Sequence, residues 1–436
     1  MDGVSRRHER LIVTKTYEQA RRHHLLVGAL VGALVAVGVA AAILAGTSSN
    51  SSSPGAITKK CQGQLIRGYC VAPGSNLTGA NLKGANLRGA NFKGTTLVRT
   101  NLTFADLTGV QSGTIAGVPS GLPTNWALRK GYLIGPGANL AGADLSGANL
   151  SGLDLAGANL NGANLSAANL DQTNLSQATV VGANLDATIL ANAKVAGLSS
   201  GSLSGVPASL PDQFKVVVGY LVGPQANLRG AGLASANLAG VNLTDADLTW
   251  ADLTSVRSGK IIGSPAGLPG HWKLVGGFLV GPSANLNGAM LTNVDVTGVE
   301  FAKVAMEKIR TLGLTGSPAS IPPEWAFTNG YLVGPWADLR GAQLQRAELS
   351  NVNLSNVNAV SAKFSYATLT NANLKDGNFT KAILPSVFLN GAKVNKGTDF
   401  SGAFLDGTHD LDPGATYSTS TTCSNGLHYG SGGDCP

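Results

Sequence analysis

Cysteine, histidine and charge are all scarce in this chain of 436 residues. No cysteine occurs between Cys70 and Cys423, and beyond position 24 the only histidines are His271, His409 and His428. Each of these histidines is isolated, and neither a phosphate-binding G-x-x-x-x-G-K-[ST] loop nor an H-E-x-x-H zinc motif occurs. Charged residues make up only 13% of the chain, which disfavours a buried catalytic pair. These absences argue against an enzyme, and they predict no cofactor, catalytic residue or metal ligand.

The acidic residues that do cluster are too few to build a site. Asp245, Asp247 and Asp252 take outward positions in the repeat described below, which predicts a solvated face. Asp410 and Asp412 offer only two carboxylates, fewer oxygen ligands than a calcium ion takes. After residue 46 the chain has 25 Lys and Arg against 21 Asp and Glu, scattered along the sequence. Neither a strongly acidic surface nor a basic nucleic-acid-binding stripe is therefore predicted.

The N-terminal part has the pattern of a membrane anchor. Residues 1–24 are basic, residues 25–46 contain no charged residue, and residues 47–57 form a polar, serine-rich linker. The uncharged run from Leu25 to Gly46 is long enough for a helix that spans a bilayer. Because basic residues flank the cytoplasmic end of such helices, we predict a cytoplasmic tail, one transmembrane signal-anchor helix and an extracytoplasmic remainder at the cell membrane.

Two further interpretations of this segment stay open. It could be a cleaved signal peptide, although residues 43–45 (Ile-Leu-Ala) make a poor cleavage site and the basic region is long for a signal. Small residues at four-residue spacing could also pair two such helices into a homodimer, or could reflect only the abundance of Gly and Ala in membrane spans. These residues are Gly28, Gly32, Ala36 and Ala40.

A five-residue repeat fills most of residues 75–405, and its register slips by one residue near Asn395. From 138 to 197 a large residue stands at every fifth position, usually with alanine two positions earlier, as in Ala138-Asn139-Leu140. A period of five fits neither a helix nor a strand, so it predicts a solenoid whose units bury their apolar faces against one another. We expect the Ala and Leu to point inward, the Asn to point outward, and the next two small residues to form a corner.

This A-(D/N)-L-x-x motif resembles that of the pentapeptide-repeat family, over roughly half of the chain. The resemblance implies a right-handed quadrilateral β-helix with four pentapeptides per coil. The predicted fold is therefore an all-β solenoid of about eleven coils with four inserted flaps, preceded by one transmembrane helix. The best-known activity of this family is mimicry of DNA, which protects a type II topoisomerase. That activity needs a strongly acidic cytoplasmic protein, and this sequence predicts neither property.

Four inserts interrupt the repeats, at 110–137, 198–225, 256–283 and 309–336. All four are equal in length, and they align without gaps on shared glycine, proline and aromatic positions. Because their length is not a multiple of five, the inserts cannot be plain repeats. We interpret each as a hairpin or lateral flap on the solenoid wall. In the first insert it would consist of an extended segment at 114–117, a proline-rich turn and a second strand at 126–134 that could serve as one wall. The inserts resemble those of some pentapeptide proteins of actinobacterial type, a weaker resemblance than that of the repeat itself.

The aromatic residues that recur in the inserts are the candidate interaction surface. They could form a platform for a glycan, a small ligand or a peptide, or they could be satellite cores that hold each insert against the solenoid. We favour packing, and binding remains the alternative. The residues are Trp126, Tyr132, Phe214, Tyr220, Trp272, Phe278, Trp325 and Tyr331.

The four cysteines lie at the two ends of the repeat region. Cys61 and Cys70 precede the repeats, and Cys423 and Cys435 follow them. Because the ends of so long a solenoid lie beyond disulfide reach of each other, we predict one local bond at each end, Cys61–Cys70 and Cys423–Cys435. Such bonds suit an exported protein. A four-ligand metal site is the alternative, but no pair of cysteines has C-x-x-C spacing.

Solenoids need protected ends, so residues 58–74 and 406–436 are assigned as disulfide-closed caps. The whole pattern predicts a non-enzymatic, membrane-anchored, extracytoplasmic scaffold with a structural or protein-interaction role. Its expected partners are the membrane, through residues 25–46, and an extracytoplasmic protein or glycan, but no nucleic acid. Two alternatives remain: glycan or small-ligand binding through the insert aromatics, and a topoisomerase-protecting DNA mimic, which charge and topology disfavour.

Overall fold

The computed structural model describes residues 61–395, 397–405 and 422–423, and every regular element within them is a β-strand or a β-bridge. No helix in these described residues is long and apolar enough to cross a membrane. The predicted tail, membrane span and linker (1–57) lie outside them, as does most of the predicted C-terminal cap (406–436).

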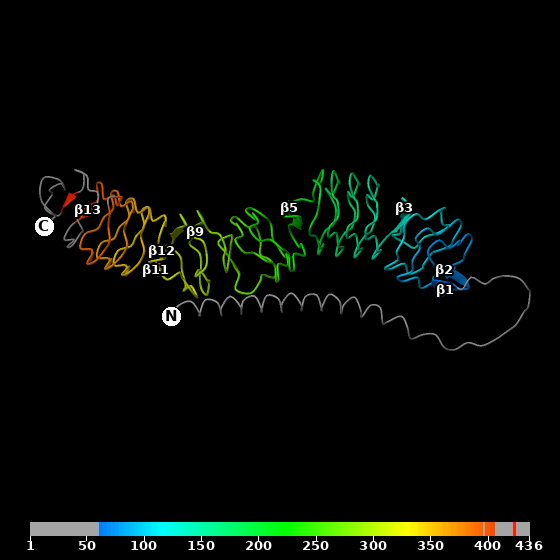
Figure 1. Ribbon diagram of the computed structural model, residues 1–436, viewed down its shortest axis with the longest axis horizontal. Helices are drawn as coiled ribbons and strands as arrows, with labels where there is room; N and C mark the ends of the chain where they lie inside the picture. Colours follow the sequence, from blue (N-terminus) through cyan, green and yellow to red (C-terminus); the bar gives the residue numbers. More distant parts are fainter. Residues whose placement is uncertain (1–60, 396, 406–421, 424–436) are drawn as a thin grey trace, which may run out of the picture. The chain divides into compact units, whose positions relative to one another are not determined.

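Parallel bridges join positions four pentapeptides apart along the repeats, so that four pentapeptides make one coil. Asn139 pairs with Asn159 on one wall of the solenoid, and Asp144 pairs with Asn164 on the next. Backbone hydrogen bonds link the coils at the same places, for example from the Leu140 N–H to the Asn159 carbonyl at 2.7 Å. Figure 1 shows these coils as successive loops along the repeat region. The expectation of four pentapeptides per coil is therefore confirmed.

Each position of the pentapeptide has its own physical role. Ala148 and Leu150 are buried, whereas Asn149 lies on the outer face of the wall, as the sequence predicts. The Asn149 side-chain oxygen accepts the Ser151 N–H at 3.2 Å, which fixes the start of the corner. Gly152 ends the corner with φ +69°, in the left-handed region that glycine enters without steric cost. The preference for Asn or Asp is thus a corner signal rather than a functional one.

The alanine position also tolerates threonine, because the buried hydroxyl finds a partner. Thr100 Oγ1 donates to the Leu77 carbonyl at 2.7 Å, and Thr173 Oγ1 donates to the Leu150 carbonyl at 2.9 Å. Both threonines are fully buried. A buried hydroxyl without a partner would cost free energy, so these bonds explain how a polar residue enters the core without disrupting it.

Each insert begins as ordinary coil and ends as a hairpin. Gln111, Ala116 and Gly121 still bridge to the preceding coil, so the first half of the first insert continues three walls. The second half forms an antiparallel hairpin, after which Asn139 bridges back to Gln111, near the start of the insert. The hairpin therefore replaces one wall of its coil. Both of its strands lie within the predicted second strand, and the predicted first strand at 114–117 instead belongs to the coil.

The hairpins pair β3 (Ala127–Arg129) with β4 (Tyr132–Ile134), β5 (Lys215–Val217) with β6 (Tyr220–Val222), β7 (Lys273–Val275) with β8 (Phe278–Val280), and β11 (Ala326–Thr328) with β12 (Tyr331–Val333). The remaining pairs are antiparallel β1 (Gln64–Ile66) with β2 (Tyr69–Val71), parallel β9 (Met290–Thr292) with β10 (Arg310–Leu312), and parallel β13 (Phe404–Leu405) with β14 (Thr422–Cys423).

The number of repeats between inserts decides which wall carries each hairpin. Successive inserts are separated by 12, 6 and 5 pentapeptides, which leave remainders of 0, 2 and 1 when a coil takes four. The hairpins β3–β4 and β5–β6 therefore occupy the same wall. The hairpin β7–β8 occupies the opposite wall, because the bridges Asp247–Gly267 and Arg257–Asn285 flank it. By the same count, the hairpin β11–β12 lies on the wall that follows the wall of β7–β8 in chain order.

Strands β4, β6, β8 and β12 divide the apolar interior into five clusters. In β4, Leu133 packs with the core of the coils before it, whereas the next residue, Ile134, packs with the core of the coils after it. Leu332 and Val333 are divided in the same way in β12. Each hairpin therefore forms a joint between two separately packed blocks of coils.

The N-terminal end is closed as predicted, and the register slip near the C-terminal end is also present. Cys61 and Cys70 form a disulfide across the β1–β2 hairpin, with the sulfurs 2.06 Å apart. Asn378 bridges to Asp399 where the regular register would select Thr398, so one extra residue enters this coil. Cys435 lies outside the described residues, as does the side chain of Cys423, and the second disulfide stays a prediction.

Aspartates that start a corner should make stability depend on pH. Ser401 hydrogen-bonds to Asp399 through its side chain and its N–H, and these bonds hold the pKa of Asp399 below its ordinary value. A carboxyl whose pKa is lowered on folding stabilises the protein above its unfolded pKa of about 3.9, and this contribution is lost as the pH falls through the folded pKa. We expect the denaturation midpoint to fall between neutral pH and about pH 3. Asp399→Asn, which keeps the acceptor, should reduce that fall; an unchanged pH profile would contradict the assignment.

Candidate interaction surface

The large aromatic residue of each insert packs across its joint. The Trp126 ring contacts the core clusters on both sides of β4 and covers Gly135 so closely that a Cβ there would lie 2.2 Å from a ring carbon. Trp272 covers Gly281 in the same way. These covering rings are half-buried. Of the other insert aromatics, Tyr132, Tyr220 and Phe278 are also half-buried, and Tyr331 is buried. The four covering rings are Trp126, Phe214, Trp272 and Trp325.

The tyrosines hold the far side of the joint. The Tyr132 hydroxyl accepts the Asp144 N–H at 3.1 Å, the Tyr220 hydroxyl accepts the Gly232 N–H at 3.0 Å, and the Tyr331 hydroxyl accepts the Gln343 N–H at 3.1 Å. Each bond joins the hairpin to the next coil, at a wall where the coil-to-coil bridge is interrupted. The geometry of the insert aromatics thus supports packing, the interpretation favoured from the sequence.

The third joint lacks this bond, because phenylalanine replaces tyrosine at position 278. Phe278→Tyr is expected to raise the free energy of unfolding by about 1 kcal/mol, since it supplies an acceptor for the Met290 N–H. Tyr132→Phe should lower the free energy by a similar amount. Denaturant unfolding of both variants would check this, and a Phe278→Tyr protein no more stable than wild type would contradict it.

A different set of aromatic residues is exposed, and sequence reasoning missed it. Phe104 is 75% exposed and Trp250 is 68% exposed, and both stand at the second corner position with positive φ. Bulky residues rarely adopt this conformation, which costs about 1 kcal/mol or more. The signal was present in the sequence as a large residue where the repeat normally carries a small one. Among the described residues, the exposed aromatic residues are Phe104, Trp250, Trp336, Tyr366, Phe388 and Phe404.

Two of these rings are paired with cations in the same way. The Arg229 guanidinium lies 3.8 Å from the Trp250 ring centroid, and its Nη1 lies 3.6 Å from Asp247 Oδ2. Lys83 Nζ lies 5.5 Å from the Phe104 ring centroid. In each case the ring stands on the corner before the wall that a hairpin occupies in the next coil. The cation belongs to the coil that precedes the ring. Exposed aromatic residues beside Arg or Lys are the chemistry of protein-contact hot spots.

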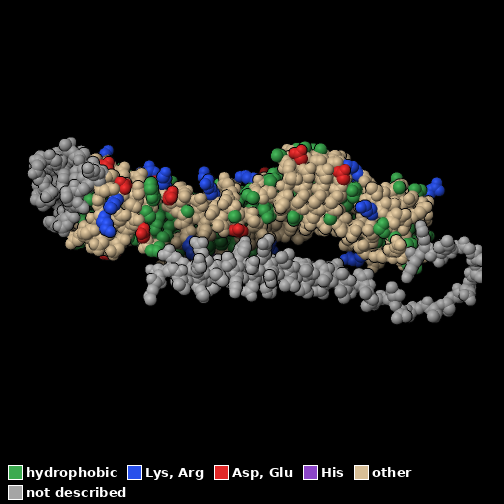
Figure 2. Space-filling view, in the orientation of Figure 1, with side chains coloured by type: hydrophobic (Ala, Val, Ile, Leu, Met, Phe, Trp, Pro, Cys, Tyr) green, Lys and Arg blue, Asp and Glu red, His purple; other side chains and the backbone are tan. Residues whose placement is uncertain are grey.

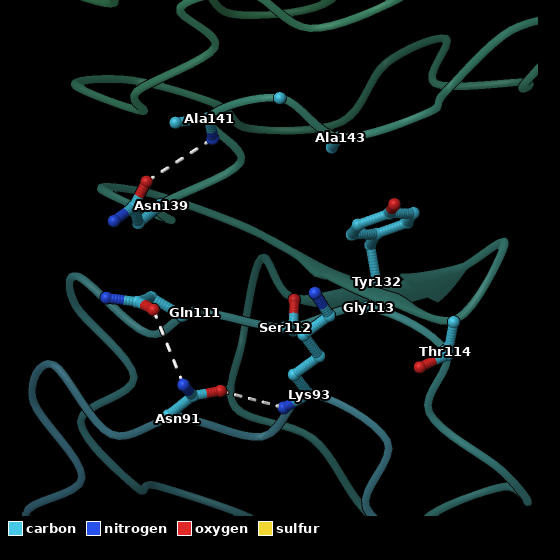
Figure 3. Close-up of a pocket in the computed structure, with 11 residues that line it drawn as sticks. Asn91, Lys93, Gln111, Ser112, Gly113, Thr114, Tyr132, Asn139, Ala141 and Ala143 are labelled. Carbon is cyan, nitrogen blue, oxygen red and sulfur yellow. Dashed lines mark hydrogen bonds between the residues drawn. The ribbon is translucent and has the colours of Figure 1, made fainter. Parts of the chain in front are cut away.

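A groove of about 310 Å³ lies beside the first hairpin. It occurs where the wall is interrupted, since Ala116 bridges to Thr96 in the coil before but not to Asp144 in the described coil after it. Figure 3 shows the Lys93 side chain extending toward Ser112 on one side of the groove, with Ala141 and Ala143 on the other. The lining residues are Asn91, Lys93, Gln111, Ser112, Gly113, Thr114, Tyr132, Asn139, Ala141, Gly142 and Ala143.

A second groove, of about 440 Å³, lies beside the second hairpin and has the opposite character. Asp245 and Asp247 line it together with Gln177 and Gln225. Thr249 hydrogen-bonds to Asp247 through its hydroxyl and its N–H, which lowers the pKa of that carboxyl. The clustered aspartates are thus partly exposed corner and wall residues, as the sequence predicts for a solvated face.

Within the part of the chain that the structure describes, no group of three or more His, Cys, Asp or Glu residues is arranged to hold a metal ion. His271 is exposed and its Nδ1 lies 2.8 Å from Glu300 Oε1, a contact between the third hairpin and the next coil. His409, His428, Asp410 and Asp412 lie outside the described residues. Positive and negative side chains are interspersed over the face in Figure 2, without a field of one sign.

Known proteins place these features in a family. The family description "Pentapeptide repeats" matches eight copies, over residues 75–110, 137–177, 168–198, 225–257, 337–376 and 362–409. No curated protein matches the sequence. Among solved structures, HetL, a pentapeptide repeat protein involved in heterocyst differentiation regulation from the cyanobacterium Nostoc sp., is 20% identical, with 74% of this chain and 84% of HetL covered and a TM-score of 0.14. QnrB1, a plasmid-mediated fluoroquinolone resistance protein, is 10% identical, with 81% and 92% covered and a TM-score of 0.12.

Similarities this low carry no argument about function. The eight matched copies cover repeat blocks and leave the four hairpins unmatched. Pentapeptide repeats imply a right-handed quadrilateral β-helix, and the bridges of this chain fit its four walls. The five-residue motif, its inward Ala and Leu and the matched copies show that this chain belongs to the pentapeptide-repeat family.

Proposed function

We propose that this protein is a non-enzymatic interaction scaffold, anchored in the cell membrane by residues 25–46 with its repeat domain on the extracytoplasmic side. The carrying observation is the pair of exposed, cation-stacked aromatic residues, Trp250 and Phe104, on strained corners of an otherwise small-residue surface. Selection for stability alone favours Gly at such corners, so the rings are best explained by a partner that buries them. The uncharged span, its basic flank and the Cys61–Cys70 bond support the location.

Photo-crosslinking in intact cells would test the contact surface. A benzophenone amino acid would replace Phe104, Trp250 or, as a matched control, Gln172, which stands at an equivalent exposed corner with φ 58°. We expect a discrete cross-linked product at position 104 or 250 and none at 172. Equal products at all three positions, or none at any, would contradict the proposal.

A cysteine at the same control position would test the location. Gln172→Cys should react with a membrane-impermeant maleimide on intact cells if the repeats are extracytoplasmic. Labelling only after lysis would place the repeats inside and reopen the topoisomerase-protecting alternative, which a gyrase-inhibition assay would then decide. The alternative of glycan binding through the insert aromatics has no specific support, because those rings pack against glycines and against the core.

A further inference from the structure

We infer that the groove beside the first hairpin binds a small polar ligand through an oxyanion, a carboxylate or a phosphate monoester. This inference goes beyond the proposed scaffold role and uses none of its aromatic corners. Lys93 is the one charged residue among those that line the groove, and no ion pair joins it to a described carboxylate. The nearby Asp144 does not line the groove, and its Oδ1 lies 3.9 Å from Lys130 Nζ.

The polar side chains of the groove have used their acceptors inside the fold. Asn139 Oδ1 accepts the Ala141 N–H at 3.3 Å, which fixes the orientation of the amide and leaves its NH₂ group as the available end. Asn91 Oδ1 accepts the Lys93 N–H at 3.0 Å, and Gln111 Oε1 accepts from Asn91 Nδ2 at 3.5 Å. The Gln111 NH₂ group therefore remains a donor without an acceptor among the described residues.

The hydroxyl groups of Ser112 and Tyr132 also accept hydrogen bonds within the fold. Ser112 Oγ accepts the Leu133 N–H at 2.9 Å, and Tyr132 Oη accepts the Asp144 N–H at 3.1 Å. Each hydroxyl then has its own hydrogen to donate. The Thr114 N–H, which would bond to the next coil in an uninterrupted stack, donates to no described residue. The groove thus combines one unneutralised cation with several side-chain and backbone donors, which is complementary to an anion.

The second joint shows that this arrangement is not a general property of the inserts. Val181 stands there in place of Lys93, and Arg229 stands in place of Ala141 but is held by Asp247 and Trp250. The corresponding serine and tyrosine contacts are kept, since Ser200 Oγ accepts the Leu221 N–H at 2.9 Å. The joint chemistry is therefore shared, whereas the second joint has no unpaired cation at these two positions.

The volume limits the ligand. A space of about 310 Å³ is at the lower end of small-molecule sites, and it suits a single sugar or amino-acid unit that carries the anionic group. A suitable probe set has one body with three substituents: D-glucose, D-glucuronate and D-glucose 6-phosphate. Binding to the full chain in detergent micelles would be followed by ligand-observed NMR titration.

We expect glucuronate or glucose 6-phosphate to bind at least about tenfold more tightly than glucose, and Lys93→Gln to remove about that factor. Lys194→Gln, at an exposed lysine outside the groove, should leave binding unchanged. Val181→Lys should create a second site. The ranking of the two anions tells a carboxylate ligand from a phosphate ligand.

Equal binding of glucose and both anions would overturn the inference, as would anion binding that survives Lys93→Gln or falls equally with Lys194→Gln. Absence of binding by either anion up to about 10 mM, with the wild-type protein folded, would also overturn it. The titration needs no cellular partner, so its failure is distinct from a failure of the cross-linking test.

Discussion

Phe379→Ala is expected to lower the free energy of unfolding of the last block of coils by about 3–5 kcal/mol. The Phe379 ring is fully buried between two others: its centroid lies 5.1 Å from that of Phe400, in a stacked arrangement, and 6.0 Å from that of Phe364. Truncation to alanine removes both ring contacts and leaves a cavity in the column of packed rings.

The effect should be confined to one block, because the core is divided at the hairpins. Hydrogen exchange measured by mass spectrometry would compare peptides from 337–405 with peptides from 138–198. We expect protection to fall in the former and to be kept in the latter. Phe388→Ala, in the same block but at an exposed ring, should change stability by less than about 0.5 kcal/mol. An equal loss of protection in both blocks would show that the stack unfolds as one unit.

Gly281→Ala is expected to cost about 2–3 kcal/mol, although it adds only one methyl group. A Cβ at this position would lie 2.4 Å from a ring carbon of Trp272, and the backbone of Gly281 is not in the left-handed region. The cost is therefore steric. The ring has to leave the two clusters that it bridges, and the third joint has no tyrosine hydroxyl to hold it together.

Gly270→Ala is the matched control, in the same insert. No atom lies within 4 Å of a Cβ built at Gly270, and its backbone conformation suits alanine. We expect a change of less than about 0.5 kcal/mol. Denaturant unfolding would report the stability of both variants. A Gly281→Ala protein as stable as the Gly270→Ala protein would show that Trp272 does not depend on the glycine.

Much of the repeat could be predicted because its causes are local. The burial of Ala and Leu, the outward Asn, the corner residues and the one-residue slip near Asn395 all follow from contacts within one unit or from the period itself. The Cys61–Cys70 bond followed from the separation of the chain ends. Trp250 and Phe104 do not recur at equivalent positions of the inserts, and each is an isolated departure from the repeat, so the pattern of recurring aromatic residues did not reveal them.

The candidate groove could not be predicted, because it depends on bonds between coils. Lys93 and Tyr132 are far apart in the sequence. They line the same groove only because the hairpin takes the place of a wall and interrupts the bridges beside it. The donor-rich character also depends on which acceptors are already occupied, such as the Asn139 oxygen at the Ala141 N–H. The sequence states the residue types but not the partners of their oxygens.

By itself, the sequence determined that this chain builds a solenoid and where its four inserts lie, because the period of five and the equal interruptions are properties of the chain alone. Only the tertiary structure decided how the inserts are used. A period of five does not state how many units close a coil; the register of the bridges does, and it turns spacings of 12, 6 and 5 repeats into hairpins on three different walls. In the second strand of each hairpin, two consecutive buried residues pack in different core clusters, as Leu133 and Ile134 do in β4. They do so because alternate side chains of a strand point to opposite faces.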